Sequence, residues 1–149
     1  MIGSMRLVFL VNAAATLAML GVILIVQHVH YPMFRGVGAE GWTAYAAEHG
    51  RRITPIVLPL MAAELVTAVM LVWMRPPWVP RAGALVGIAL VGVAWLSTGL
   101  VQVPLHTRLG AGWDASVHAR LVATNWIRTA AWAARGGLVL WLLARLFRP

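Results

Sequence analysis

The chain has 149 residues, enough for one domain, but its composition excludes an ordinary soluble fold. Hydrophobic residues make up 61% of it and charged residues only 11%, whereas about a quarter of a soluble domain is charged. The formal net charge of +8 comes from arginines that stand singly or in pairs, so we expect anionic lipid head groups as partners and no nucleic acid. Without cysteine there can be no disulfide, thiolate metal site or redox dithiol.

Four apolar stretches are long enough to cross the hydrocarbon core of a bilayer, which takes about 20 helical residues. The predicted spans are residues 7–26, 56–74, 82–103 and 121–147. Because spans of this length must be helices, the sequence predicts an all-α fold. We expect a single integral membrane domain, residues 1–149, built as a four-helix transmembrane bundle. The first span is too long for the core of a signal peptide and has no cleavage site after it, so we expect it to be retained.

Prolines and a tryptophan indicate where these helices begin and end. Pro32 predicts that the first helix stops just before it, since a residue that precedes proline avoids the helical region. Pro55 suits the first turn of the second helix. Between them, residues 40–52 (EGWTAYAAEHGRR) predict a short amphipathic helix in the first long loop. This helix would lie in the membrane interface with Trp42 and Tyr45 as anchors.

An even number of spans puts both termini on one side of the membrane. The segments on that side are very short, and their arginine density favours a cytoplasmic location, in the inner membrane of a bacterium. The arginines of those segments are Arg6, Arg75, Arg81, Arg145 and Arg148. In the third span, Gly83 and Gly87 have the small-xxx-small spacing that permits close helix approach. We expect this glycine-rich helix to be the surface of any homo-oligomer.

All five histidines belong to the side opposite the termini. His28 and His30 lie at the end of the first span, and His106 follows the third. On an ideal helix His28 and His30 point about 200° apart, so only one of them is expected to face the bundle interior. His49 and His118 are expected to be solvated or interfacial.

Charged and polar residues also occur inside two predicted spans. A carboxylate in hydrocarbon is costly, so Glu64 should face the bundle interior with a partner. In the fourth span the spacing puts four side chains on one interior face. They are Asn125, Arg128, Trp132 and Arg135. Glu64 falls between the two arginines in depth. Two interpretations stay open: Glu64 is the structural partner of an arginine, or it is a metal ligand or proton acceptor.

These groups can be collected in one site at the histidine side of the bundle. The candidate metal ligands are His28, His30, Glu64 and His106. Two or three imidazoles with one carboxylate suit iron, zinc or copper. The candidate catalytic residues are Glu64, His106, Asn125 and Arg128. Arg128 and Asn125 would orient an oxyanion or carbonyl, while Glu64 and His106 would supply base, ligand or acid–base chemistry. The chain has no His-Glu-x-x-His motif and no Glu-x-x-His pair, so this hypothesis rests on convergence alone.

Two segments carry a family resemblance: VPLHTRLGAGWD (residues 103–114) and LVATNWIRTAAW (residues 121–132). They resemble a family of small four-helix membrane proteins that includes the fungal anthrone oxygenases. The family has a Val-Pro-Leu-Asn-like element at the end of helix three and a Trp-x-x-x-(Asn/His)-x-x-Arg-like element at the start of helix four. Residues 103–105, Asn125 and Arg128 match these elements, whereas His106 stands where an asparagine is expected. The resemblance implies oxygenation of a lipophilic aromatic substrate at the membrane.

The sequence therefore predicts an integral membrane oxidoreductase or oxygenase-like enzyme with a polar intramembrane pocket for a small lipophilic substrate. Two alternatives stay open. The first is a haem- or metal-binding membrane module without turnover, with histidines of the first and third spans as axial ligands. The second is a small membrane scaffold or transporter subunit, in which the buried charges only hold the helices in register. The candidate cofactors are a transition metal (iron, copper or zinc) and haem.

Overall fold

The computed structural model describes residues 2–146, which form helices joined by short turns. Phe147, the predicted end of the fourth span, and Arg148 lie outside the described residues. In chain order the elements are α1 (Ile2–Ile25), η1 (Val26–His30), α2 (Tyr31–Met33), η2 (Phe34–Gly36), α3 (Ala39–Trp73), α4 (Arg81–Ser97), η3 (Thr98–Gln102), α5 (Val103–Gly110) and α6 (Ala115–Leu146). Of these, η1 and η3 are single π-helical turns and η2 is a 3₁₀ turn.

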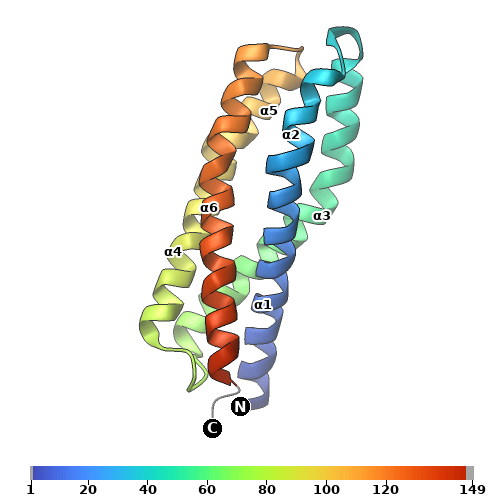
Figure 1. Cartoon of the computed structure of the whole chain (residues 1–149). Coiled ribbons are helices and arrows are strands. Elements are labelled where there is room, and N and C mark those ends of the chain that lie inside the picture. Colours follow the sequence, from blue (N-terminus) through green and yellow to red (C-terminus); the bar gives the residue numbers. More distant parts are fainter. Residues whose placement is uncertain (1, 147–149) are drawn as a thin grey trace.

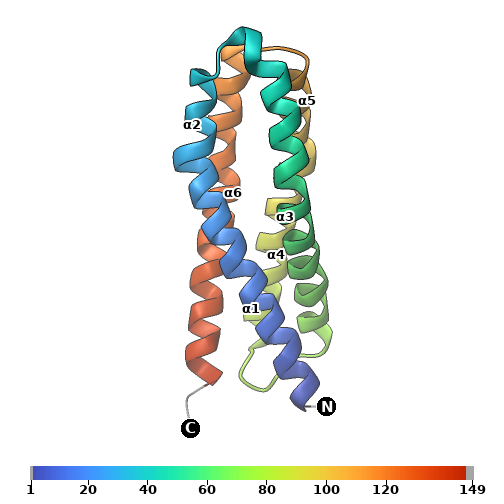
Figure 2. The ribbon, with the colours of Figure 1, turned by 90° about the vertical axis from the view of Figure 1, so that its right-hand side faces the viewer.

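These elements form four long columns that run alternately up and down (Figures 1 and 2). The first column is α1 with η1, α2 and η2; the second is α3; the third is α4 with η3 and α5; the fourth is α6. Both α1 and α4 pack against α3 and α6. The two ends of the described chain lie at one end of the bundle, called here the terminal end (Figure 1). The opposite end is called the distal end.

Three of the columns are long and apolar enough to cross a membrane: Gly3–Gly36, Ala39–Trp73 and Arg81–Gly110. These apolar helices indicate an integral membrane protein. The predicted all-α arrangement of four helices is confirmed. The fourth column, α6, is more polar and is not among the three. Its arginines are Arg120, Arg128, Arg135 and Arg145.

The first column does not end before Pro32, so that prediction is wrong. Val26–His30 form a π turn, in which the N–H of Tyr31 bonds the carbonyl of Val26. The helix then continues through Pro32 to Gly36. Proline has no N–H, and its ring clashes with the preceding turn of a regular α-helix. The wider π turn just before Pro32 accommodates the ring, so the column continues.

The third column contains the same device. Its π turn, Thr98–Gln102, stands just before Pro104, and the N–H of Val103 bonds the carbonyl of Thr98. The helix then continues as α5 to Gly110, well beyond the predicted end of the span. π-helical turns are rare in proteins, and those that occur are often found at functional sites. Both π turns of this chain lie in the distal half of the bundle, so a functional site is expected there.

The second column also begins earlier than predicted. Gly38 has a φ of 83°, a conformation that favours glycine, and α3 starts directly after it. Residues 40–52 are helical, as predicted, but they are the first turns of α3 and not a separate helix lying in the interface. Pro55 consequently lies in the interior of α3 instead of its first turn. Trp42, one of the two expected interface anchors, is buried.

The fourth column begins at a well-formed cap. The Asp114 carboxylate accepts hydrogen bonds from the backbone N–H groups of Ser116 (2.8 Å) and Val117 (3.0 Å) and from the Ser116 hydroxyl (2.7 Å). This is the pattern of an N-terminal capping residue. The bonds, that of the Ser116 side chain above all, hold the pKa of Asp114 below its usual value. The helix therefore starts at Ala115, ahead of the predicted span.

The predicted close approach at Gly83 and Gly87 occurs within the chain. Both glycines are buried against α6. A Cβ on Gly83 would lie 3.7 Å from Leu142, and a Cβ on Gly87 would lie 2.7 Å from Nη1 of Arg135. The pair thus serves the packing of α4 on α6 within the chain.

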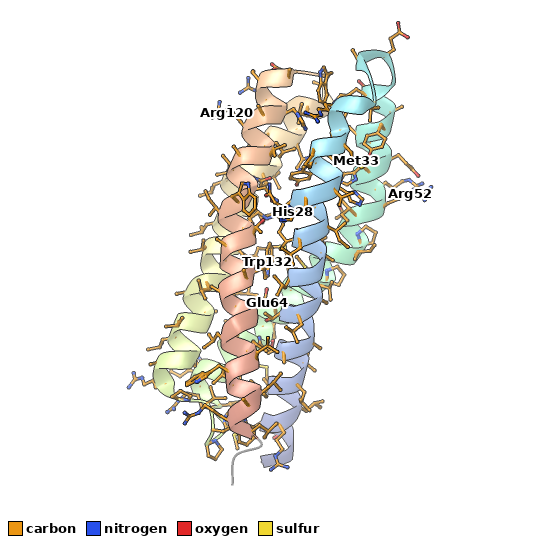
Figure 3. The ribbon with its side chains drawn as sticks, viewed as in Figure 1. His28, Met33, Arg52, Glu64, Arg120 and Trp132 are labelled. Carbon is orange, nitrogen blue, oxygen red and sulfur yellow. The ribbon has the colours of Figure 1, made fainter. Side chains whose placement is uncertain are left out.

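Exposed arginines border an apolar belt around the bundle. Arg52 and Arg120 project outward in the distal half of the bundle (Figure 3), and Arg75 is exposed near the terminal end. From Arg52 to the end of α3 at Trp73, two residues before Arg75, the helix rises about 32 Å at 1.5 Å per residue. This is close to the hydrocarbon thickness of roughly 30 Å. Exposed side chains inside the belt include Ile56 and Val66, more than half exposed, as expected for contact with lipid.

Candidate functional site

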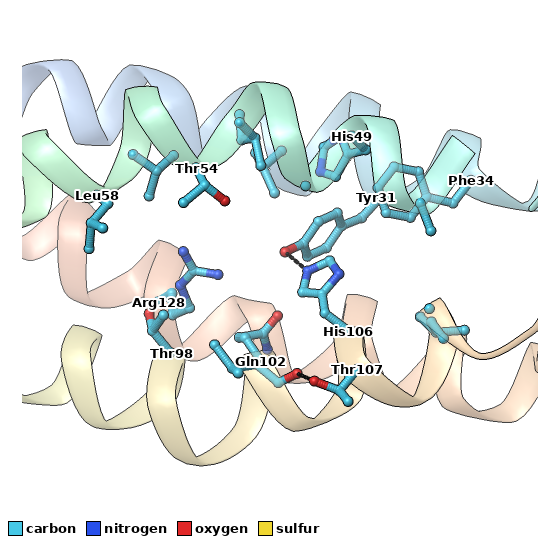
Figure 4. Close-up of a pocket in the computed structure, with 18 of the residues that line it drawn as sticks. Tyr31, Phe34, His49, Thr54, Leu58, Thr98, Gln102, His106, Thr107 and Arg128 are labelled. Carbon is cyan, nitrogen blue, oxygen red and sulfur yellow. Dashed lines mark hydrogen bonds between the residues drawn. The ribbon is translucent and has the colours of Figure 1, made fainter. Parts of the chain in front are cut away.

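A cavity of about 420 Å³ lies in the distal half of the bundle, with wall residues from all four columns. Its volume is in the range of pockets that hold small molecules, roughly 300 to 1,000 Å³. Most of the wall is apolar. The polar side chains in it are Tyr31, His49, Thr54, Thr98, Gln102, His106, Thr107 and Arg128, labelled in Figure 4. Of the predicted catalytic residues, His106 and Arg128 are therefore in the wall.

The two π turns supply matching halves of this site. In each, a glutamine is followed four positions later by a ring: Gln27 and Tyr31 in the first column, Gln102 and His106 in the third. Both glutamines are buried and donate to α6 through their Nε2 atoms. Gln27 donates to a backbone carbonyl at 3.3 Å and Gln102 to a threonine hydroxyl at 2.9 Å. The two turns are thus anchored on α6 and present their rings to each other.

Tyr31 and His106 meet at the cavity. The Tyr31 hydroxyl and Nε2 of His106 share a hydrogen bond of 2.8 Å (Figure 4). Tyr31 is fixed further by His118, whose Nε2 donates to the Tyr31 carbonyl at 2.7 Å. A phenol bonded to an imidazole can relay a proton in either direction, so this pair has the composition of a general acid–base unit.

Arg128 reaches the cavity from α6 (Figure 4) and carries an unneutralised charge. It is only 7% exposed, and within residues 2–146 it makes no ion pair with a carboxylate. Its guanidinium lies over the Trp132 ring, 5.3 Å from the centroid. In the same range its buried Nε has no hydrogen-bond partner, and neither has Oε1 of Gln102. A buried unpaired cation is unfavourable, so the cavity suits an anionic or strongly polarised oxygen.

Asn125 orients Arg128 and does not line the cavity. It is fully buried; its Nδ2 donates to Oε1 of Gln27 at 2.9 Å, and its Oδ1 accepts from Nη1 of Arg128 at 3.2 Å. The same Gln27 oxygen accepts from the Thr129 hydroxyl at 3.3 Å. Because both ends of the Asn125 amide are engaged, its part is to position the guanidinium, whereas the sequence predicted that it would contact a substrate.

Glu64 belongs to a second polar cluster, inside the bundle and outside the cavity wall (Figure 3). Its Oε1 accepts from Nε of Arg135 at 3.2 Å and from the Thr16 hydroxyl at 2.7 Å. Its Oε2 accepts from Nε1 of Trp132 at 2.9 Å. Arg135 also donates to Asn12 and Thr16, both at 3.0 Å. Of the two interpretations of Glu64, this geometry matches the structural ion pair.

The structure separates the predicted metal ligands, which are His28, His30, Glu64 and His106. His28 is exposed and packs edge-on against Trp126, with ring centroids 5.4 Å apart. His30 lies beside His49, with centroids 6.0 Å apart. Among the described residues no group of three histidine, aspartate or glutamate side chains could hold a metal ion. The donor set therefore does not fit the predicted metal site.

Several residues of the site were not predicted. His49, expected to be solvated, lines the cavity, and His118 is only 8% exposed because it bonds Tyr31. Tyr31 and Gln102 were not identified as site residues. One sequence signal could have found them: the pattern of glutamine, three residues and a ring occurs twice, each time with a proline beside it.

An aromatic cluster closes the cavity at the distal end. Phe34 and Trp42 line it and are 2% and 1% exposed. Nε1 of Trp42 donates to the carbonyl of Leu109 at 2.6 Å, which ties α3 to α5. Tyr45 and Trp113 pack against Trp42 with ring centroids 5.8 and 4.8 Å away. These rings cover the cavity along the bundle axis.

Comparisons of the chain with family models, with curated proteins and with solved structures give no match. The geometry of the cavity is therefore the basis for a functional assignment.

Proposed function

We propose that this protein is an integral membrane oxidoreductase of the oxygenase type, whose distal cavity binds a small lipophilic substrate with a phenol or carbonyl oxygen. The observation that carries the proposal is the buried charge of Arg128, which faces an apolar cavity without a carboxylate partner in the described chain. A phenolic oxygen in the cavity can accept a hydrogen bond from the Arg128 guanidinium, which lies in the wall. The Tyr31–His106 pair stands at the same cavity.

The proposed chemistry uses only the side chains of the cavity, since the described residues do not assemble a metal site. His106, bonded to Tyr31, removes a proton from a methylene carbon next to the substrate's aromatic ring. Arg128 stabilises the negative charge that develops on the conjugated oxygen. The carbanion then donates an electron pair to dioxygen and forms a carbon–oxygen bond, and the peroxide anion takes the proton back from His106 to give a hydroperoxide. Loss of water from the hydroperoxide leaves a ketone, so one methylene and one dioxygen become one carbonyl and one water.

The family resemblance of residues 103–132 supports the hypothesis that the protein is an oxygenase. Two of the matched residues are Arg128 and Asn125, which here form one hydrogen-bonded unit at the cavity. His106, which replaces the asparagine typical of the family, adds a base next to Tyr31. We further infer that the termini face the cytoplasm of a bacterial cell and that α6 spans the inner membrane with the other columns. The cavity then opens in the outer leaflet of that membrane.

The test is an Arg128→Gln variant with Arg120→Gln as its control. Arg120 is on the same helix but exposed at the distal end, so its replacement removes a charge without touching the cavity. Dioxygen uptake is measured with the purified protein in nanodiscs, with anthrone as the probe. We expect Arg128→Gln to lower the rate about a hundredfold or more, the usual effect of losing an oxyanion donor. Arg120→Gln should retain the full rate. Equal rates in both variants would overturn the proposal.

A second candidate is a lipophile-binding protein without turnover. It is favoured by the same buried charge of Arg128, which the oxygen of a bound lipophile would face without any reaction. The two candidates differ in one readout. A binding protein takes up the phenol in an Arg128-dependent way but consumes no dioxygen, whereas the oxygenase does both.

A further inference from the structure

We propose that the substrate enters the cavity sideways from the bilayer, between α3 and the η3–α5 segment, and that it is a phenolic lipid. Its ring lies in the cavity with the hydroxyl on Arg128, and its alkyl chain passes out through this opening, called here the lateral portal. The proposal rests on the function proposed for this cavity and names its substrate class.

The exposure of the wall residues locates the portal. Those contributed by the first column and by α6 are buried or partly buried, including Val26 and Arg128. The wall residues that are more than a third exposed all belong to α3 and α5. They are Ala47, Thr54, Leu58, Val103 and Thr107. Because Phe34 and Trp42 cover the distal end, the cavity communicates with its surroundings through the side of the bundle.

The depth of the portal places its inner edge in hydrocarbon. Leu58 lies six residues beyond the exposed Arg52, about 9 Å along α3. Val103 lies five residues before the exposed Arg108, about 7.5 Å along the third column. Leu58 and Val103 are 52% and 53% exposed, and nearby Leu100 is 73% exposed. An apolar surface of this kind inside the arginine border is in contact with acyl chains.

The wall of the cavity explains the choice of an aromatic head group. Tyr31, Phe34, His49 and His106 surround its distal part with rings, and Tyr31 to Phe34 and Phe34 to His49 measure 5.3 and 5.1 Å between centroids. Rings prefer offset or edge contacts with another ring at such distances. Arg128 adds a donor for one oxygen. A single aromatic ring with one hydroxyl matches this set, and the lateral portal provides the exit for a chain that would not fit inside.

The experiment compares two probes, 4-ethylphenol and 4-dodecylphenol, in nanodiscs. Two portal variants narrow the opening, Leu58→Trp and Val103→Trp; both positions face lipid, so each variant tolerates the larger side chain without disturbing the core. The control is Leu100→Trp, at an exposed site outside the cavity wall. Arg128→Gln is included to report on the head-group site. Ratios of affinity between variants cancel the partition of each phenol into lipid.

We expect the portal variants to bind 4-dodecylphenol at least about tenfold more weakly than the unmodified chain, and 4-ethylphenol within about twofold of it. Leu100→Trp should change neither affinity, and Arg128→Gln should weaken both. If the portal variants affect both phenols equally, or neither, the lateral portal is wrong even though the cavity site stands. If the unmodified chain does not bind 4-ethylphenol, or Arg128→Gln binds both phenols normally, the proposed cavity site fails as well.

Discussion

The two buried arginines of α6 differ in their partners. Arg135 has a structural partner, whereas Arg128 lies in the wall of the cavity. Arg135 forms an ion pair with Glu64, whereas Arg128 has no carboxylate partner in the range described. Removing the Glu64 charge leaves the Arg135 guanidinium buried and uncompensated. We expect Glu64→Gln to lower the free energy of unfolding by about 3 to 5 kcal/mol. Unfolding of the protein in mixed micelles with increasing denaturing detergent measures the change.

Glu48 offers a matched control on the same helix. It is paired with Arg51 and Arg52 at exposed positions, and exposed ion pairs contribute little. Glu48→Gln should therefore unfold at the same detergent fraction as the unmodified chain. The double variant Glu64→Gln with Arg135→Gln should regain part of the loss, since both charges are gone. A Glu64→Gln protein as stable as the Glu48→Gln protein would show that the pair is not needed.

For single residues, the orientation of charged side chains inside apolar spans could be predicted from the sequence. A carboxylate and two arginines inside apolar spans must face inward. The depth estimate put Glu64 between Arg128 and Arg135, and in the structure Glu64 pairs with Arg135. The predicted metal ligands His28, His30, Glu64 and His106 form no group of three that could hold an ion within residues 2–146, because helix direction and depth together decide convergence. The direction of a side chain cannot be predicted from the spacing of an ideal α-helix where a π turn changes the rotation per residue, as it does at Val26–His30.

The contact of α4 with α6 gives a test at the level of elements. At Gly87 an added Cβ would lie 2.7 Å from Nη1 of Arg135, whose guanidinium is held by Glu64, Asn12 and Thr16. The Arg135 guanidinium cannot move away from the added Cβ without losing those hydrogen bonds. We expect Gly87→Ala to destabilise the protein by about 1 to 3 kcal/mol, as overpacking does. Detergent-induced unfolding again provides the measurement.

Gly92, on the same helix, is the control. An added Cβ there meets no atom within 4 Å, so only helix propensity acts. Gly92→Ala should be neutral or stabilise the protein by up to about 1 kcal/mol. The interpretation of α4–α6 packing would be wrong if both alanine variants had the same stability.

Helix ends were the least predictable feature of the elements. Pro32 was expected to end the first helix because regular α-helices exclude proline, and the third span was expected to end at residue 103. A π turn before Pro32 and another before Pro104 let both columns continue. These turns also matter for the site. They contain Gln27 and Gln102, and they position the rings of Tyr31 and His106 just after them. The apolar spans were easier to predict, because a helix that contacts lipid needs a long run of apolar residues and such a run is visible in the sequence.

At the scale of the whole molecule, the arrangement of the bundle in the membrane can be tested with single cysteines, since the chain has none of its own. Pro77 and Gly112 lie in short turns at opposite ends of the bundle, one between α3 and α4 and the other between α5 and α6. The apolar belt between the arginine borders separates these turns by about the thickness of the hydrocarbon core, roughly 30 Å. If all four columns span the membrane with the termini in the cytoplasm, the two turns face different compartments.

A membrane-impermeant maleimide on bacterial spheroplasts reads this out. We expect Gly112→Cys to be labelled directly and Pro77→Cys only after the membrane is permeabilised, with the unmodified chain unlabelled throughout. Labelling of both cysteines in intact spheroplasts would mean that the bundle does not cross the bilayer. The reverse pattern would keep the four spans but invert them. The lateral portal would then open into the cytoplasmic leaflet, and the phenolic lipid would have to be supplied from that side.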